Sequence, residues 1–245
     1  MYKPKFLVGI VLACYVLFAV FEFSGNGTVA FYFKSFMVPF IAIAYTFYVN
    51  PKNNLFWAFL ICYSLSDLLA IGFGELPFFT PEEVKNYDYF IGNGLYMLSY
   101  LFLIFKIVRL TNFKYVFKNL KLYSIVLVFL NVYLFYVLNS FIEPNLTYQV
   151  DYYFECVYNV IILTLFFVGM INFFCRDNQK SLFLFLGSLS IVLSEIMAIA
   201  YLYIGQRELL NFLSTTFALI AFNLFYYQTS LSNVNTKESS FIYKD

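Results

Sequence analysis

Eight apolar stretches, each close to 20 residues long, constrain most strongly what this 245-residue chain can fold into. A helix needs about 20 residues to cross the hydrocarbon core of a membrane. The chain is 62% hydrophobic and 12% charged, whereas a soluble domain is about 25% charged. We therefore predict an all-α polytopic membrane protein with about eight transmembrane helices in one bundle. The predicted spans are 6–23, 33–49, 54–73, 89–108, 121–141, 151–174, 181–204 and 210–230.

The positive charges indicate how the helices cross the membrane. Lys and Arg accumulate in the cytoplasmic connections of membrane proteins. With the amino terminus inside, only Lys34, Lys85 and Arg207 of the fifteen basic residues fall on the outer side. We expect an integral protein of a membrane such as the bacterial inner membrane, with both termini cytoplasmic. The transmembrane domain would cover residues 1–230, and residues 231–245 would form a short, polar cytoplasmic tail that is disordered or loosely attached.

The longest outer connection contains a pattern typical of a helix start. Thr80 can cap a helix, Pro81 suits its first position, and two glutamates follow. A short extracytoplasmic helix is expected there, before the fourth span.

Several classes of chemistry are disfavoured by composition. Histidine is absent, which removes histidine-ligated metals and imidazole catalysis. The four cysteines show no C-x-x-C spacing, so we expect neither disulfides nor a metal site. No basic run is dense enough to bind nucleic acid. We expect no cofactor, and membrane lipids as partners.

Acidic residues within the spans are the strongest functional signal, because a carboxylate in lipid is costly. Glu22 and Glu155 lie near the outer ends of their spans and are expected to reach interfacial water. Asp67 and Glu195 lie 13 to 14 residues into outward-running spans, about 20 Å of helix rise. These two acids are therefore expected to lie beyond mid-membrane but still within it.

Asp67 and Glu195 also share a sequence context. L-S-D-L-L-A-I at residues 65–71 matches L-S-E-I-M-A-I at residues 193–199, with four of seven positions identical. The two segments fall on the third and seventh spans. Because these spans are four apart, both are expected to cross the membrane in the same direction. The match favours two four-helix halves in parallel repeat, although a chance match of this length is equally compatible.

Two interpretations of these acids remain open. In the first, each acid bonds a neighbouring helix, through Lys34 or a tyrosine, and only fixes packing. In the second, both face one polar cavity that opens outward, approach within about 8–10 Å, and have Lys34 near its mouth. The residues that would complete the cavity are Tyr63, Ser64, Ser66, Asn93, Asn159, Ser188 and Ser194.

At these residues the chain resembles the YhhN family of eight-span membrane proteins, which includes the eukaryotic lysoplasmalogenases. The matching positions are Lys34, Ser64 with Asp67, Gly187 with Ser188, Ser194 with Glu195, and Tyr226, Tyr227 and Gln228. The family's Lys-Pro is Lys34-Ser35 here, its second aspartate is Glu195, and its fourth-span histidine has no counterpart.

The resemblance implies hydrolysis of the vinyl-ether bond of lysoplasmalogens. Asp67 and Glu195 would be catalytic, in either assignment of acid and base. Residues expected to contact substrate are Lys34, Ser64, Asn93, Ser194 and Tyr227. An acid held in a low-dielectric site can protonate an alkenyl ether while an ionised partner directs water. The alternatives are a small transporter that uses the same acids as ion sites and a non-catalytic membrane protein.

Overall fold

The computed structural model describes residues 5–50, 52–75, 88–142, 149–229 and 231. Within these ranges every regular element is a helix, and eight helical segments are long and apolar enough to cross a membrane. The chain is thus an all-α polytopic membrane protein, as predicted. The expected helix at Thr80 and the tail that follows Leu231 lie outside the described residues.

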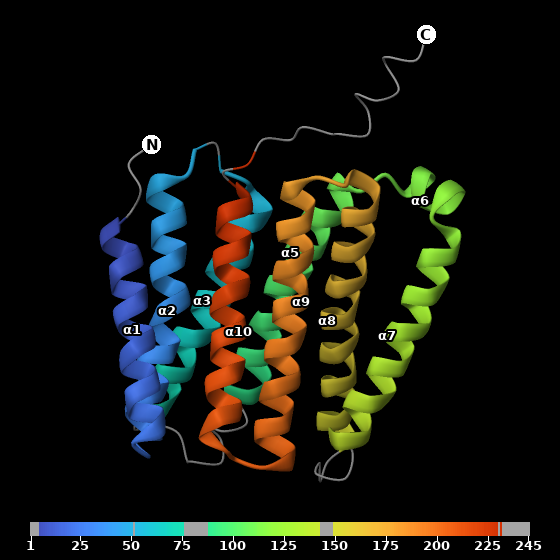
Figure 1. Cartoon of the computed structure of the whole chain (residues 1–245). Helices are drawn as coiled ribbons and strands as arrows, with labels where there is room; N and C mark the ends of the chain where they lie inside the picture. The colour runs from blue at the N-terminus through green and yellow to red at the C-terminus, as the bar shows by residue number, and fades with distance from the viewer. Residues whose placement is uncertain (1–4, 51, 76–87, 143–148, 230, 232–245) are drawn as a thin grey trace. The chain divides into compact units, whose positions relative to one another are not determined.

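The chain divides into two compact units, residues 1–103 and 104–245. The first unit contains α1 (Lys5–Phe23), α2 (Gly27–Tyr48), α3 (Asn54–Glu75), the π-helix η1 (Asp88–Gly92) and most of α5 (Asn93–Leu110). Consecutive helices are neighbours: α1 packs on α2, α2 on α3, and α3 on η1 (Figure 1).

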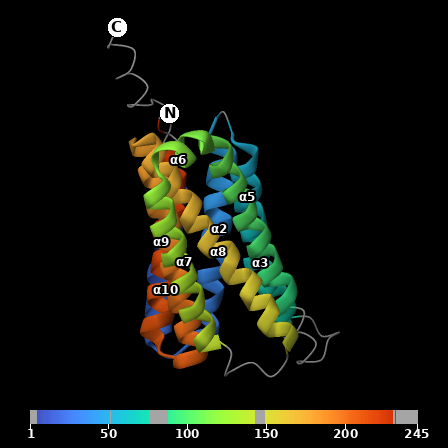
Figure 2. The same ribbon diagram turned by 90° about the vertical axis from the view of Figure 1, so that its right-hand side faces the viewer.

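The second unit repeats this order of packing. Its elements are α6 (Phe113–Asn119), α7 (Lys121–Ile142), α8 (Gln149–Arg176), α9 (Gln179–Ile199), the π-helix η3 (Ala200–Ile204) and α10 (Glu208–Thr229). Helices α7, α8, α9 and α10 pack in chain order, as the row in Figure 1 shows. Figure 2 shows the short α6 at one end of this unit, leading into α7. Each unit is therefore built by neighbouring helices of alternating direction, as short connections require.

The predicted spans match the helices to within a few residues, except for the second. Helix α2 begins at Gly27 rather than at residue 33. Gly25 has a φ of 80° and makes the turn after α1, and the apolar segment that follows contains nothing to delay the helix. Lys34 therefore lies about 10 Å inside α2, and the prediction that it opens the helix is wrong.

Small residues allow α9 to pack closely on both of its neighbours. A Cβ atom at Gly187 would lie 2.4 Å from Cε1 of Phe225 on α10. A Cβ atom at Gly169 of α8 would lie 2.8 Å from Oγ of Ser188 on α9. Close contact at small residues is a main source of helix association in membranes, where no hydrophobic effect drives it. These contacts hold α9, the helix that carries Glu195, between α8 and α10.

Candidate functional site

Asp67 is held by the two helices that follow and precede α3 in the first unit. The hydroxyl of Tyr96 on α5 donates a hydrogen bond to Asp67 Oδ1. Lys34 on α2 interacts electrostatically with the same carboxylate. Because α3 runs opposite to α2 and α5, a residue late in α3 meets residues early in the other two. We call Asp67, Tyr96 and Lys34 the Asp67 cluster.

The surroundings of Tyr96 fix the geometry of this cluster. The Tyr63 ring lies 4.5 Å from the Tyr96 ring, measured between centroids. Ser66 donates a 2.8 Å hydrogen bond to the carbonyl oxygen of Gly92, the last residue of η1. Short π-helical turns occur frequently at functional sites. The start of α5 is thus tied to α3 through Tyr63 and Ser66, the second of which directly precedes Asp67.

Chemically, the Asp67 cluster brings together an acid, a phenol and a cation. Asp67 and Lys34 are both partly exposed rather than fully enclosed. A carboxyl group that is oriented by a phenol can give up or accept a proton, and an ammonium group can hold an anionic substrate. The cluster therefore contains the groups for acid–base chemistry on an anionic amphiphile.

Glu195 has a similar environment in the second unit. The hydroxyl of Tyr158 on α8 donates a 3.0 Å hydrogen bond to Glu195 Oε1. The preceding residue, Ser194, donates a 2.8 Å hydrogen bond to the carbonyl oxygen of Ser214 on α10. Glu195 is partly exposed, whereas Ser194 is buried.

The matched sequence segments thus make matched contacts. In both, the serine bonds a backbone carbonyl of the next membrane helix, at 2.8 Å for Ser66 and for Ser194. In both, the acid accepts a hydrogen bond from a tyrosine. The tyrosine comes from the following span for Asp67 and from the preceding span for Glu195. The shared serine contact supports a repeat, and the different tyrosines give each acid its own surroundings.

Among the other predicted site residues, Ser64 lies three positions before Asp67, and Asn93 lies next to the residue that Ser66 contacts. Ser64 is buried and donates a hydrogen bond to the carbonyl oxygen of Leu60 in its own helix. Asn93 is the first residue of α5 and follows Gly92, the acceptor of the Ser66 bond. Asn93 is therefore placed beside the Asp67 cluster, while the Ser64 hydroxyl is engaged within α3.

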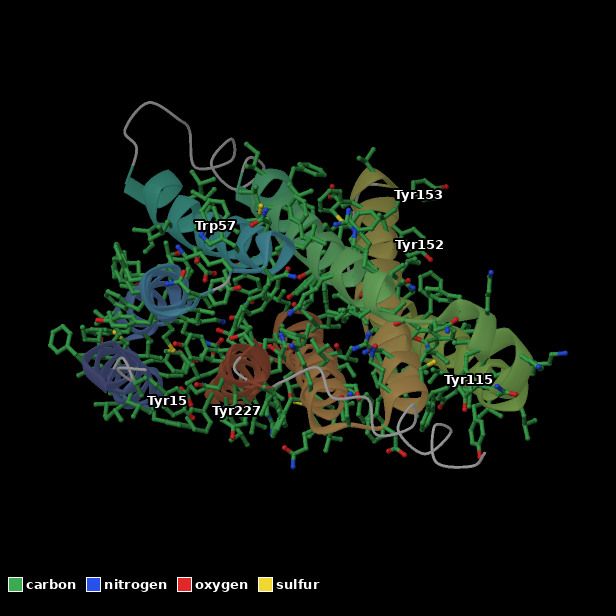
Figure 3. The ribbon with its side chains drawn as sticks, turned by 90° about the horizontal axis from the view of Figure 1, so that it is seen from above. Tyr15, Trp57, Tyr115, Tyr152, Tyr153 and Tyr227 are labelled. Carbon is green, nitrogen blue, oxygen red and sulfur yellow. The ribbon has the colours of Figure 1, made fainter. Side chains whose placement is uncertain are left out.

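Tyr227 lies far from Glu195 in the second unit. Its ring packs edge-on against Phe183, with 5.1 Å between ring centroids. Glu195 is twelve positions further along α9, about 18 Å of helix rise. Figure 3 labels Tyr227 on α10. The structure does not bring Tyr227 together with Glu195.

Asn159 and Ser188 take part in helix packing. Asn159 is buried and its Nδ2 donates a 3.3 Å hydrogen bond to Oδ1 of Asn139 on α7. Cys156 Sγ donates to the same oxygen, also at 3.3 Å. Ser188 donates to the carbonyl oxygen of Leu184 in its own helix. Both side chains are therefore engaged in contacts within or between helices.

Glu22 and Glu155, the two acids expected to reach interfacial water, differ in their exposure. Glu22 is 5% exposed, so the prediction that it reaches water is wrong. Packing of α1 on α2 covers this position, as the stacked rings of Phe21 and Phe33 beside it show. Glu155 is partly exposed, and the Tyr203 hydroxyl lies 3.5 Å from its Oε1.

A groove of about 370 Å³ lies between α7 and α8 in the second unit. Its lining is apolar except for Asn131 and Thr164. None of the predicted site residues lines it, so this groove is not the polar cavity expected around the acids.

The sequence did not identify Tyr96 and Tyr158 as the partners of the acids. The chain contains 23 tyrosines, and depth in the membrane was the only signal available to select two of them. Asp67 and Glu195 belong to different units, and the expected approach between them stays a prediction.

Within the described residues, no group of three His, Cys, Asp or Glu side chains is arranged to hold a metal ion. Comparison of the chain with family models, curated proteins and solved structures finds no match.

Proposed function

We propose that the chain is a membrane-embedded hydrolase that cleaves the vinyl-ether bond of lysoplasmalogen-like lysophospholipids. The observation that carries the proposal is the Asp67 cluster, in which a carboxylate accepts the Tyr96 hydrogen bond and interacts with Lys34. The YhhN resemblance supplies the bond type.

In the proposed reaction, Asp67 transfers a proton to the outer carbon of the O–CH=CH group. The product of this step is an oxocarbenium ion, which water attacks at the carbon bonded to oxygen. Water then loses a proton to the carboxylate, and the resulting hemiacetal breaks down to a fatty aldehyde and the glycerophospho alcohol. One water is consumed and the proton is returned, so no other reactant is required. General acid–base catalysis of this kind contributes about 10²- to 10⁴-fold.

The geometry supports a division of roles. Tyr96 engages Asp67 Oδ1, which leaves Oδ2 to carry the proton. Lys34 would hold the substrate phosphate. Only the glycerol carbons separate this phosphate from the vinyl-ether oxygen, so a lysine beside Asp67 is close enough to contact it. A lysine about 10 Å inside a helix reaches toward the interface along its flexible stem. Glu195, oriented by Tyr158, is the second candidate for directing water.

The test compares two substrates that differ in one double bond. Purified protein in detergent is given a 1-O-alkenyl lysophospholipid or its saturated 1-O-alkyl counterpart. The proposal predicts aldehyde release from the first and none from the second, because a saturated ether has no carbon that accepts the proton. If neither lipid is hydrolysed while proteoliposomes show proton or cation flux, the transporter interpretation replaces this one.

A further inference from the structure

Three cations gather at the opposite end of the second unit from Glu195. Lys106 precedes the end of α5 by four positions, Arg176 ends α8, and Lys180 lies in the first turn of α9. Lys106 is subject to the positive charge of Lys180, and Lys180 to that of Arg176. Lys106 is only 5% exposed. Like charges brought together in a region of low dielectric repel each other strongly, so this arrangement favours an anion.

Backbone carbonyls orient two of the three cations. Arg176 Nε donates a 2.9 Å hydrogen bond to the carbonyl oxygen of Leu110, which ends α5. Lys180 Nζ donates a 3.1 Å hydrogen bond to the carbonyl oxygen of Leu231, just beyond α10. Four helix ends therefore meet here, and both of these contacts are made to carbonyl oxygens, which carry no formal charge.

Two fully buried amides accompany the cations. Asn172 and Gln228 are both 0% exposed. The Nδ2 group of Asn172 and both polar side-chain atoms of Gln228 have no hydrogen-bond partner among the described residues. Leaving such groups unsatisfied costs about 1–3 kcal/mol each, and in native proteins such atoms usually have a water or ion as partner.

The buried amides are linked to the cations through the helices that carry them. Asn172 lies one turn before Arg176 on α8, and its Oδ1 is 3.4 Å from Oγ1 of Thr111. The Leu231 amide donates to the carbonyl oxygen of Gln228 at 3.3 Å, at the turn that Lys180 contacts. Amide N–H donors beside ammonium and guanidinium groups are what phosphate oxygens require.

The start of α9 adds to the positive potential. Asn178 caps this 21-residue helix and bonds the amide of Ser181 at 2.9 Å. The positive end of a helix dipole favours anions. Asp177, the acid in the same turn, is exposed, whereas Lys106 is buried.

We infer that Lys106, Arg176, Lys180, Asn172 and Gln228 form a binding site for a phosphate group. We call these residues the Lys106 cluster. The phosphate belongs either to the headgroup of an anionic lipid in the adjoining leaflet or to free inorganic phosphate. Basic pockets between membrane helices bind phosphate headgroups in this way. The inference is independent of the proposed hydrolase activity, which concerns the Asp67 cluster.

The experiment measures the thermal unfolding midpoint of the full chain in neutral detergent. Short-chain phosphatidylglycerol, short-chain phosphatidylcholine and inorganic phosphate are titrated separately. Stabilisation by phosphatidylglycerol alone assigns the site to a lipid headgroup, and stabilisation by inorganic phosphate as well assigns it to the phosphate group itself. If neither ligand stabilises the protein beyond the phosphatidylcholine control, the inference is wrong.

Two variants and one control separate this site from general charge effects. Lys106→Gln should weaken the apparent affinity roughly tenfold to 100-fold, as expected for a charge-assisted contact. Arg109→Gln removes an equal charge from the same helix at an exposed position and should change the affinity little. Equal losses in the two variants would contradict a specific site.

Gln228→Leu keeps the test decisive if Lys106→Gln does not fold. It replaces two buried polar atoms that have no partner among the described residues with an apolar side chain of similar size. The unliganded protein should be at least as stable as the wild type, and phosphate-dependent stabilisation should be reduced. Full retention of that stabilisation would overturn the assignment of Gln228 to the site.

Discussion

The Tyr96 hydroxyl donates a hydrogen bond to Asp67 Oδ1 and so joins the acid of α3 to the first turn of α5. The carboxylate is therefore oriented by a neighbouring helix. An acid with a purely structural role could accept the same hydrogen bond. Measuring turnover after this bond is removed therefore distinguishes a catalytic role from a structural one.

Tyr96→Phe should reduce turnover of an alkenyl lysophospholipid about 10- to 100-fold while the protein stays folded. The change removes one hydrogen bond to a charged group, which is worth about 1.5–3 kcal/mol, and keeps the ring that packs on Tyr63. Initial rates of aldehyde release measure the effect. Tyr136→Phe, at a 72% exposed position on α7, is the control and should keep the wild-type rate. Full activity in Tyr96→Phe would remove Tyr96 from the mechanism.

Ser194→Ala should lower the free energy of unfolding by about 0.6 kcal/mol, the average for an interhelical hydrogen bond in a membrane protein. The lost bond joins α9 to the Ser214 carbonyl on α10. Ser190→Ala is the matched control, because Ser190 bonds the Leu186 carbonyl within its own helix. Unfolding is followed by denaturant titration in micelles. A larger loss from Ser190→Ala would contradict the role given to the Ser194 contact.

Gly187→Ala should destabilise the protein by about 1–3 kcal/mol, the usual cost of overpacking. The added methyl group would lie 2.4 Å from a ring atom of Phe225, which is itself fully buried. Gly9→Ala on α1 has nothing within 4 Å of its new Cβ and should not lower stability. The midpoints of thermal unfolding in detergent compare the two, and equal midpoints would show that α9 and α10 separate readily.

Most of the fold could be predicted from the sequence, because the membrane thickness fixes the length of an apolar helix. The predicted second span begins six residues late, because a lysine in an apolar segment favours a boundary and Lys34 lies inside α2. A lysine is tolerated inside a membrane helix when it interacts with an acid, and Lys34 interacts with Asp67. That interaction depends on the packing of α2 on α3, which hydropathy does not encode.

The site was predictable only in part. Asp67 and Glu195 could be selected, because a carboxylate in lipid is costly wherever it occurs. Their tyrosine partners depend on which faces of neighbouring helices meet. The charge rule predicts that Lys106 lies at the cytoplasmic boundary. Its burial near Lys180 of α9 cannot be predicted from a single basic residue near the end of a span.

The orientation of the chain stays a prediction with a direct test. Reporter fusions after residue 245 and within the 74–88 connection should report opposite sides of the membrane, with the terminus cytoplasmic. The expectation follows from the charge asymmetry and the even number of spans. Reporters on the same side would overturn it.

The central claim is that Asp67 performs acid–base chemistry on a vinyl-ether lysophospholipid, and the most direct measurement is the turnover of Asp67→Asn. The amide keeps the size of the side chain but cannot supply the proton. Purified wild type should release aldehyde and glycerophospho product in equal amounts, and Asp67→Asn should be slower by about 10²- to 10⁴-fold with an unchanged elution profile. Glu195→Gln in parallel decides whether the second acid takes part. Wild-type turnover in a well-folded Asp67→Asn protein, or no product from the wild type, would contradict the claim.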